Sequence, residues 1–314
     1  MRGKLVAAGL ALILVSEAGF GHDLKGLIRE QNTGSSTSLA EAIAQTPTAD
    51  FATKSVLNNL RLWPVPRKLT ICFHSGAAAL RKRVADSMRR VWPLATLTEG
   101  RLDFDTATFD SMPDCEPSPK ADVRVDFKDK DGYWSYVGVE SRLHKQSMNL
   151  EGFTETLPED REFDRIVGHE AGHALGLEHE HQSPAAPKCG WDFDFLWENY
   201  TWASKQDMYD NFTKLQDYIS KRKHAYVFST YDPRSEMHYA FDAKAFKDGE
   251  NDPCFITQNY TPSDQDKNAI RVAYGPNLVA LQTQMKGLLP ELPKTIADAR
   301  LQAILKIKAD LLNE

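Results

Sequence analysis

The spacing of apolar positions predicts the ordered elements in the first half of the chain. Residues 68–74 (KLTICFH) form a short β-branched and aromatic run, which favours a strand. Between 77 and 92, apolar residues recur at helical spacing in a segment rich in Ala, Arg and Lys, which predicts a helix. Polar and apolar side chains alternate over 122–127 (DVRVDF), as they do in a half-buried strand.

Further strands and a second long helix are predicted next. An aromatic segment bounded by glycines covers 132–138 (GYWSYVG), and 146–150 (QSMNL) has the character of one more strand. Residues 160–177 predict a helix, which is clearest at 164–173. A strand, a helix and then several strands is the order of an α/β (α+β) fold built on one mixed sheet.

The regular pattern weakens after Gly176. Residues 191–216 contain helical patches, whereas 227–239 have the composition of loops and turns. A closing helix is predicted over 264–274. The segment 276–314 is apolar at helical spacing but interrupted by two prolines, so we expect a C-terminal tail of two short helices that pack on the main body or beside a partner.

The N-terminus predicts a secretory signal. Arg2 and Lys4 precede an apolar run over 5–15, and small residues follow it, so we place signal cleavage after residue 18 or 21. An uncleaved membrane anchor is the less favoured alternative, because about 11 apolar residues are fewer than the roughly 20 that a spanning helix needs. Residues 19–60 are polar and mixed, and we interpret them as a propeptide or N-terminal extension.

Composition and charge narrow the class of protein. The chain has 314 residues, of which 41% are hydrophobic and 26% charged, and its net charge of -6 argues against a nucleic-acid partner. In a secreted protein the four cysteines favour two disulfides. Three pairings are open, and proximity in the sequence favours Cys72–Cys115 with Cys189–Cys254. Their wide spacing argues against a cysteine zinc site.

The strongest chemical signal is a short histidine motif in the second predicted helix. His169-Glu170-Ala171-Gly172-His173 places two imidazoles four residues apart, on one helix face and about one 5.4 Å turn from each other. This spacing suits a zinc ion. Glu170 lies beside that face, where its carboxylate can take a proton from the attacking water and deliver it to the leaving amine.

Six further residues extend the motif to HEAGHALGLEH. Gly176 follows His173 by three positions, and His179 follows three positions later. A glycine can adopt the left-handed conformation that ends a helix, so the chain can turn back and bring His179 to the metal. Three protein ligands leave one position open, which is typical of a catalytic zinc site rather than a structural one.

Beyond these residues, HEAGHALGLEHEH resembles the long zinc signature of the metzincin endopeptidases, and the Glu-His after the third histidine is similar to the astacin branch. The segment 235–239 (SEMHY) resembles the Met-turn of astacins. The resemblance implies that Met237 forms a hydrophobic floor under the zinc and that Tyr239 is a swinging extra ligand that steadies the oxyanion. It also implies a metzincin-like fold, with a mixed twisted sheet and an active-site helix above a less regular C-terminal subdomain.

The resemblance extends over about residues 61–275, which we interpret as the catalytic domain. Leu62-Trp63-Pro64 resembles its start, and 134–138 (WSYVG) resembles the segment after its substrate-binding edge strand. Residues 263–275 resemble its last helix. The tail at 276–314 lies outside the resemblance.

Three polar residues beside the motif have alternative roles. By resemblance Glu180 meets a new N-terminal ammonium after maturation near Leu60–Leu62, and the alternative is a solvated glutamate at a helix end. His181 and His238 are expected to be polar wall residues, since three histidines already fill the protein positions of the metal. They could orient substrate or a ligand imidazole.

Together these features predict a secreted, periplasmic or extracellular endopeptidase with one catalytic Zn²⁺ and protein or peptide substrates. We expect the substrate to bind in extended form along an exposed sheet edge near 121–127, and no membrane contact after signal removal. The loops at 182–194 and 211–230 are the expected sources of specificity.

Two alternatives concern the activity and the branch. One is a catalytically silent metzincin-fold binding module, which the intact Glu170 disfavours. The other is a peptidase of a matrixin-like or serralysin-like branch. Tyr239 counts against the first of these branches, and the absence of calcium-binding repeats counts against the second.

Overall fold

The structure is a computed structural model of the full chain. It describes residues 57–58, 61–116, 120–129, 131–153, 160–200, 204–206, 208–209, 212, 226–227, 230–276, 278–279, 282 and 299–313. The predicted signal peptide and almost all of the predicted extension lie outside the described residues, as does most of the predicted specificity loop at 211–230.

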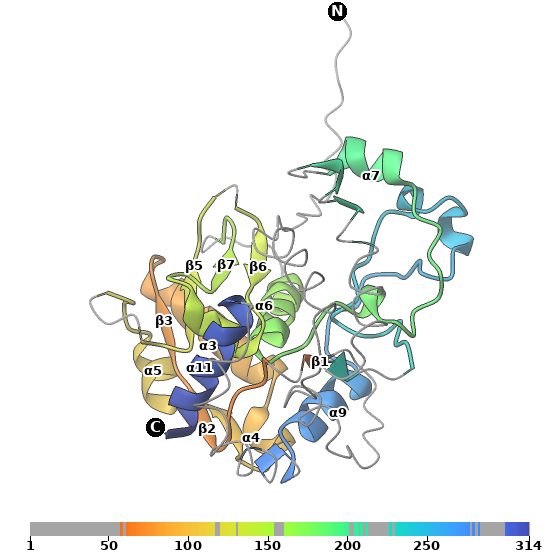
Figure 1. Cartoon of the computed structure of the whole chain (residues 1–314). Coiled ribbons are helices and arrows are strands. Elements are labelled where there is room, and N and C mark those ends of the chain that lie inside the picture. Colours follow the sequence, from red (N-terminus) through yellow and green to blue (C-terminus); the bar gives the residue numbers. More distant parts are fainter. Residues whose placement is uncertain are drawn as a thin grey trace, which may run out of the picture.

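Short strands and longer helices alternate through the first half of the chain (Figure 1). The strands are β1 (Leu57–Asn58), β2 (Arg67–Leu69), β3 (Ile71–Phe73), β4 (Leu102–Phe104), β5 (Val123–Asp126), β6 (Tyr133–Ser135), β7 (Met148–Leu150) and β8 (Tyr226–Val227). The helices are α3 (Ala78–Val91), α4 (Leu94–Leu97), α5 (Thr106–Ser111), α6 (Asp160–Ala174), α7 (Phe193–Asn199), α9 (Asp264–Ala273) and α11 (Ala299–Asn313). Short 3-10 helices are η2 (Gly138–Leu143), η3 (Glu180–Gln182), η4 (Ala243–Ala245) and η5 (Gly249–Asn251).

A four-stranded mixed sheet forms the centre of the N-terminal part, in the order β3-β5-β7-β6. The first three strands are parallel, and β6 runs antiparallel to β7 at the edge, with Trp134 opposite Asn149. The mixed sheet of an α/β (α+β) fold is therefore confirmed. The expected substrate-binding edge at 121–127 is wrong, because β5 lies in that segment and pairs with β3 on one side and β7 on the other.

The predicted strand at 68–74 is divided in two. Its first part, β2, pairs with β4 in a separate two-stranded sheet, whereas β3 enters the main sheet. Between them, the carboxylate of Asp122 accepts hydrogen bonds from the backbone N–H of Thr70 at 3.1 Å and from the guanidinium of Arg67 at 2.8 Å. This buried carboxylate satisfies the backbone where the chain changes from one sheet to the other.

The helices α3 and α6 pack against each other beside the main sheet (Figure 1). Both match the predicted helices, and their apolar faces are buried in one core. The indole Nε1 of Trp92, just after α3, donates to the carbonyl of Gly168 on α6 at 2.9 Å. A Cβ on Gly168 would lie 2.7 Å from Val91 Cγ1, so a glycine is required for this close approach.

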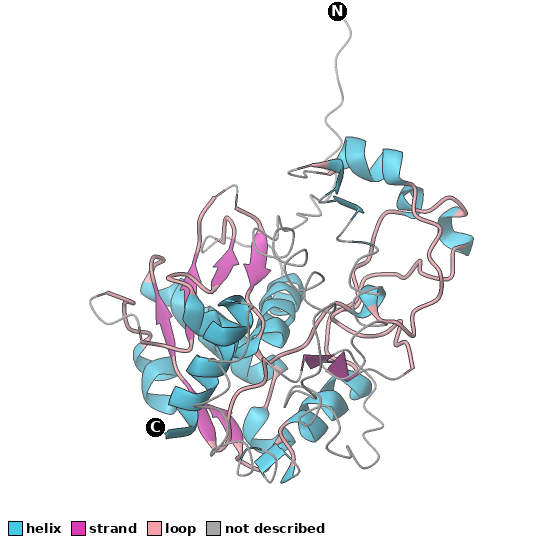
Figure 2. Cartoon of the chain, in the orientation of Figure 1, coloured by secondary structure: helices cyan, strands magenta, loops and turns pink. Residues whose placement is uncertain are grey.

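Among the described residues between Gly176 and Ser263, loops and turns predominate, as the sequence predicted (Figure 2). The disulfide between Cys189 and Cys254 links two of these loops beside a cluster of buried aromatic side chains. A second disulfide joins Cys72 on β3 to Cys115. Both pairings are those that proximity favoured, so this expectation is confirmed.

The C-terminal tail packs onto the N-terminal part. Ile304 and Leu311 of α11 join the main core, and α11 lies against η2. Gln282 accepts a hydrogen bond from the backbone N–H of Val65 at 2.9 Å, and its amide donates to the carbonyl of Trp63 at 3.3 Å. Of the described helices, none is long and apolar enough to cross a membrane.

Candidate active site

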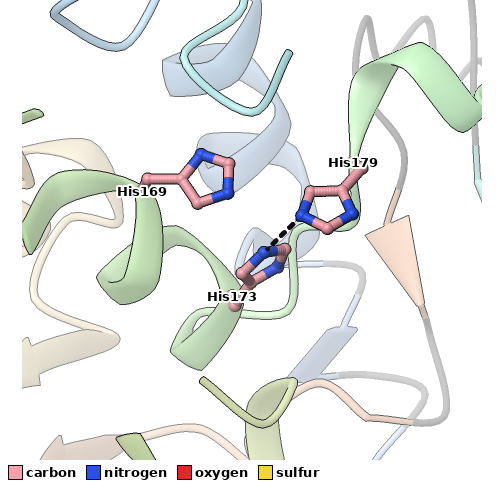
Figure 3. Close-up of side chains that lie close together, drawn as sticks. All are labelled: His169, His173 and His179. Carbon is pink, nitrogen blue, oxygen red and sulfur yellow. Dashed lines mark hydrogen bonds between the residues drawn. The ribbon is translucent and has the colours of Figure 1, made fainter. Parts of the chain in front are cut away.

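Three histidine side chains converge at the C-terminal end of α6 (Figure 3). His169 and His173 come from successive turns of α6, and His179 comes from the loop that follows. One ring nitrogen of each lies within 4.8 Å of those of the other two, and all three side chains are buried. The structure therefore brings together the three ligands expected from the sequence.

The turn that delivers His179 depends on a glycine. Gly176 has a φ of 99°, in the left-handed region that residues with a Cβ rarely adopt. The backbone N–H groups of Gly176 and Leu177 donate to the carbonyls of His173 at 2.8 Å and Gly172 at 3.0 Å, which close the end of the helix. The helix-ending role predicted for Gly176 is confirmed.

Backbone carbonyls fix the orientation of the two helical imidazoles. His169 Nδ1 lies 2.9 Å from the carbonyl oxygen of Glu236, and His173 Nδ1 lies 2.8 Å from that of Leu177. A carbonyl oxygen only accepts hydrogen bonds, so each Nδ1 carries the proton. Each Nε2 then presents a lone pair to the centre of the site, as a metal-ligating histidine requires.

Burial keeps these imidazoles neutral. Desolvation, followed by the neighbouring imidazole of His173, lowers the pKa of His169 and of His179 well below its ordinary value. Desolvation is also the main cause that lowers the pKa of His173, to about 4, and the charge of Arg61 adds to it.

These observations test whether the site fits a metal ion. Within the described part of the chain, the buried Nε2 of His169 has no hydrogen-bond partner. An orphaned buried acceptor is costly unless something fills the position. Three neutral nitrogen donors at these separations are the donor set of a catalytic zinc ion, so the residues fit this metal.

Glu170 occupies the position on α6 next to the first histidine. Its side chain is buried. Helix α6 packs against the edge strand β6, and the charge of Glu170 is among the causes that raise the pKa of Tyr133 on that strand, after desolvation, Glu151 and Glu162. Glu170 is therefore a buried carboxylate on the helix that carries His169 and His173 and packs against the edge of the sheet.

The Met-turn segment lies against the histidines. The ring of Tyr239 is 4.3 Å from that of His179 and 5.3 Å from that of His169, between ring centroids. Met237 is fully buried, and a Cβ on Gly172 would lie only 2.6 Å from its sulfur. Met237 therefore packs directly under the helix turn that carries both helical histidines.

A network centred on α9 holds the Met-turn in place. Asp266 accepts hydrogen bonds from the hydroxyl of Ser235 at 2.7 Å and the backbone N–H of Glu236 at 2.9 Å. The same carboxylate accepts from the backbone N–H of Ser263 at 3.0 Å, as half of a capping box. Sequence reasoning missed Asp266, although its position three residues after Ser263 at a helix start is a capping signal.

The three polar residues beside the motif are all buried. Glu180 accepts a hydrogen bond from the backbone N–H of Asp232 at 2.9 Å, so the alternative of a solvated glutamate is wrong. His181 lies among aromatic rings, 5.0 Å from that of Tyr239. His238 contacts the hydroxyl of Tyr231 through Nε2 at 2.6 Å. Neither histidine belongs to the group whose nitrogens converge.

Glu236 is an unexpected buried acid in the Met-turn. Within the described residues neither of its carboxylate oxygens has a hydrogen-bond partner. Burial, followed by the charge of Asp266, raises its pKa well above the ordinary value. The side chain reaches α6 beside Gly168, since a Cβ there would lie 2.8 Å from Glu236 Oε1. No pattern in the sequence distinguished this residue.

Buried neutral imidazoles around one point, with a carboxylate beside them, define the class of zinc-dependent hydrolases. The family follows from comparison with known proteins. The model of the Astacin family of peptidases matches residues 114–274, which include every residue of the site described above from His169 to Asp266. This chain belongs to the astacin family and is a zinc metalloendopeptidase.

Solved structures were also found that are similar to this chain. A structure of myroilysin is 25% identical, has a TM-score of 0.53, and its match covers 70% of this chain and 98% of that chain. A crystal structure of myroilysin is 26% identical with a TM-score of 0.47, covering 68% of this chain and 86% of that chain. High choriolytic enzyme 1, a hatching enzyme zinc-protease from the medaka fish Oryzias latipes, is 19% identical with a TM-score of 0.35, covering 68% of this chain and 94% of that chain. A search of curated proteins found no significant match.

Proposed function

We propose that His169, His173 and His179 hold the catalytic zinc ion and that Glu170 and Tyr239 carry the proton transfer and charge stabilisation of peptide hydrolysis. The observation that carries this proposal is the convergence of three buried imidazole nitrogens within 4.8 Å. A bound zinc ion supplies Lewis acidity that polarises the scissile carbonyl and makes water a stronger nucleophile.

Glu170 acts as the general base. Its carboxylate takes a proton from the attacking water while the water oxygen adds to the carbonyl carbon of the substrate. The same carboxyl group then gives the proton to the nitrogen of the leaving amine as the C–N bond breaks. Its place on α6, next to His169 in a helix that packs against the edge strand β6, supports this role.

Tyr239 stabilises the charge that develops on the carbonyl oxygen. Its phenol can donate a hydrogen bond to an oxyanion. Contact of its ring with His179 and His169 supports a position at the metal.

The substrate is a protein or peptide, and we place it along β6 in extended form. In the described part of the chain β6 pairs only with β7, so its other edge can add a strand. A peptide bound there would cross the site beside α6, because α6 packs against β6.

The chain is proposed to be secreted to an extracellular or periplasmic space, with signal cleavage after residue 18 or 21. Two disulfides support an oxidising compartment. Residues 19–60 would then be a propeptide or extension, 61–275 the catalytic domain and 276–314 a helical tail. Sequencing the N-terminus of the exported protein tests the signal: a start at Met1 would contradict it.

Removal of the metal tests the proposed function. Dialysis against a chelator should abolish cleavage of an unfolded protein substrate, and one equivalent of Zn²⁺ per chain should restore it. His173→Ala should prevent both zinc binding and restoration. Full cleavage by the metal-free chain would contradict the proposal.

A further inference from the structure

Residues 61–63 form a strap beside the turn that ends α6. The indole Nε1 of Trp63 donates to the carbonyl of Ala174 at 2.7 Å. Leu62 packs against Gly176 so closely that a Cβ on this glycine would lie 2.8 Å from Leu62 Cδ2. The strap and the turn therefore run in opposite directions in contact with each other, over the residues that lead to the third histidine.

The first residue of the strap makes the contact nearest to that histidine. The guanidinium of Arg61 lies 3.4 Å from a carboxylate oxygen of Glu178 and 3.1 Å from one of Glu140. The side chains are 11%, 3% and 0% exposed, respectively, so the three charges interact away from bulk water. Charge-assisted contacts in such surroundings are strong and sensitive to geometry.

The position of Arg61 is fixed by a second element, η2. The backbone N–H of Val139 donates to the carbonyl of Arg61 at 2.8 Å. Gly138 has a φ of 53°, and a Cβ there would overlap that same carbonyl oxygen. Because η2 also supplies Glu140, η2 holds both the backbone and the side chain of Arg61. The same guanidinium also contacts Glu178.

Glu178 connects this anchor to the metal centre. It stands between Leu177, whose carbonyl orients the ring of His173, and His179 itself. A side chain that fixes Glu178 therefore restrains the backbone on both sides, and with it the directions of two of the three imidazoles. Groups that hydrogen-bond directly to a metal-ligating side chain change metal affinity by about 10- to 100-fold when they are lost, so a restraint that acts through the backbone should fall at the lower end of this range.

We propose that Arg61 is a positioning residue for the zinc site: anchored on η2, it holds Glu178 so that the turn presents His179 to the metal. This inference rests on the proposed ligation by His169, His173 and His179. It adds to that proposal a residue that touches neither zinc nor substrate.

The experiment measures the zinc dissociation constant of the full chain by competition with a chelator, well below the melting temperature. Glu178→Leu leaves the Arg61–Glu140 pair intact, so the variant should fold, and we expect its zinc binding to weaken about 10-fold. Glu178→Gln keeps an acceptor oxygen, so its zinc dissociation constant should lie between those of Glu178→Leu and the wild type. Arg61→Lys, which keeps the charge but loses the forked geometry, should also weaken zinc binding.

A double variant tests whether the two residues act together. If Arg61 acts through Glu178, Arg61→Lys combined with Glu178→Leu should weaken zinc binding no more than the stronger single variant. Losses that multiply in the double variant would overturn the proposal, as would wild-type zinc affinity in either Glu178→Leu or Arg61→Lys.

Arg81→Lys is the matched control. Arg81 is 16% exposed and pairs at 2.7 Å with Asp114, and its other hydrogen bonds go to the carbonyls of Ser75, Gly76 and Met112, so it is a partly buried arginine like Arg61 whose contacts lie away from the strap and the turn. Arg81→Lys should lower the melting temperature without changing the zinc dissociation constant. An equal loss of zinc affinity in this control would show a general stability effect and overturn the proposal. His179→Ala tests the underlying ligation separately: unchanged zinc affinity there would contradict the proposed ligand set itself.

Discussion

In His169 and His173 the two ring nitrogens have different surroundings. Nδ1 faces a backbone carbonyl, from Glu236 or from Leu177, and Nε2 faces the site. The spacing of the motif predicted which histidines would meet, because helix geometry and one glycine are local properties. It did not predict the carbonyl partner of His169, which comes from residue 236, far away in the sequence.

Loss of the phenol hydroxyl of Tyr239 should impair catalysis without affecting metal binding. Tyr239→Phe keeps the ring that packs on His179 but removes the hydroxyl that is proposed to donate to the oxyanion. We expect kcat to fall about 100-fold, with one zinc ion still bound per chain. Steady-state kinetics and metal analysis of the same preparation check this. An unchanged kcat would exclude a role for the hydroxyl in catalysis.

At the scale of elements, the amphipathic helices were predictable and the strand order was not. Residues 77–92 and 160–177 gave α3 and α6 within a few residues, because helical periodicity depends on neighbouring positions. The edge of the sheet was assigned to 121–127, but β5 in this segment is central. Which strand lies at an edge depends on pairing between distant segments, and alternation of side chains within one strand does not reveal it.

Helix α9 holds the Met-turn through hydrogen bonds between segments that are distant in the sequence. Asp266→Ala removes the acceptor of three hydrogen bonds and leaves buried donors in the Met-turn without a partner. We expect the free energy of unfolding to fall by about 3 kcal/mol in denaturant titrations. Asp264→Ala, in the same helix turn but exposed, is the control and should have a much smaller effect. Equal losses in both variants would contradict the role of Asp266.

At the scale of the whole molecule, the tail and the N-terminal part form a common core. Helix α11 contributes Ile304 and Leu311, and Gln282 binds the backbone at Trp63 and Val65. The periodicity of 276–314 predicted helices that pack on the main body or beside a partner, but it did not decide between the two or identify the surface. The surface on which they pack is formed by η2 and by the backbone of Trp63 and Val65, which no local pattern in the tail specifies.

The buried Lys308 on α11 predicts that the stability of the folded chain depends on pH. Desolvation lowers its pKa from 10.5 to about 8 in the folded protein. Between these two values the unfolded chain binds more protons than the folded chain, so Lys308 makes stability increase as pH rises from about 8 to 10.5. Below about pH 8 Lys308 is protonated in both the folded and the unfolded chain, so the free-energy cost of burying its charge does not change with pH.

Lys308→Met should therefore raise the free energy of unfolding at pH 7 by up to about 3 kcal/mol. It should also reduce the increase in stability between pH 8 and 10.5. Denaturant titrations of both proteins over this pH range check the expectation. Parallel pH profiles for the variant and the wild type would contradict it.

Glu170 is proposed to perform the chemistry at a zinc ion held by three histidines. This role can be tested by comparing bound zinc and peptide cleavage in the wild type, in Glu170→Gln and in Glu162→Gln, which is a control on the same helix. We expect one zinc ion per chain in all three, wild-type cleavage by Glu162→Gln, and kcat/KM lowered by about 100- to 10,000-fold in Glu170→Gln. Cleavage by Glu170→Gln at the wild-type rate would contradict the account.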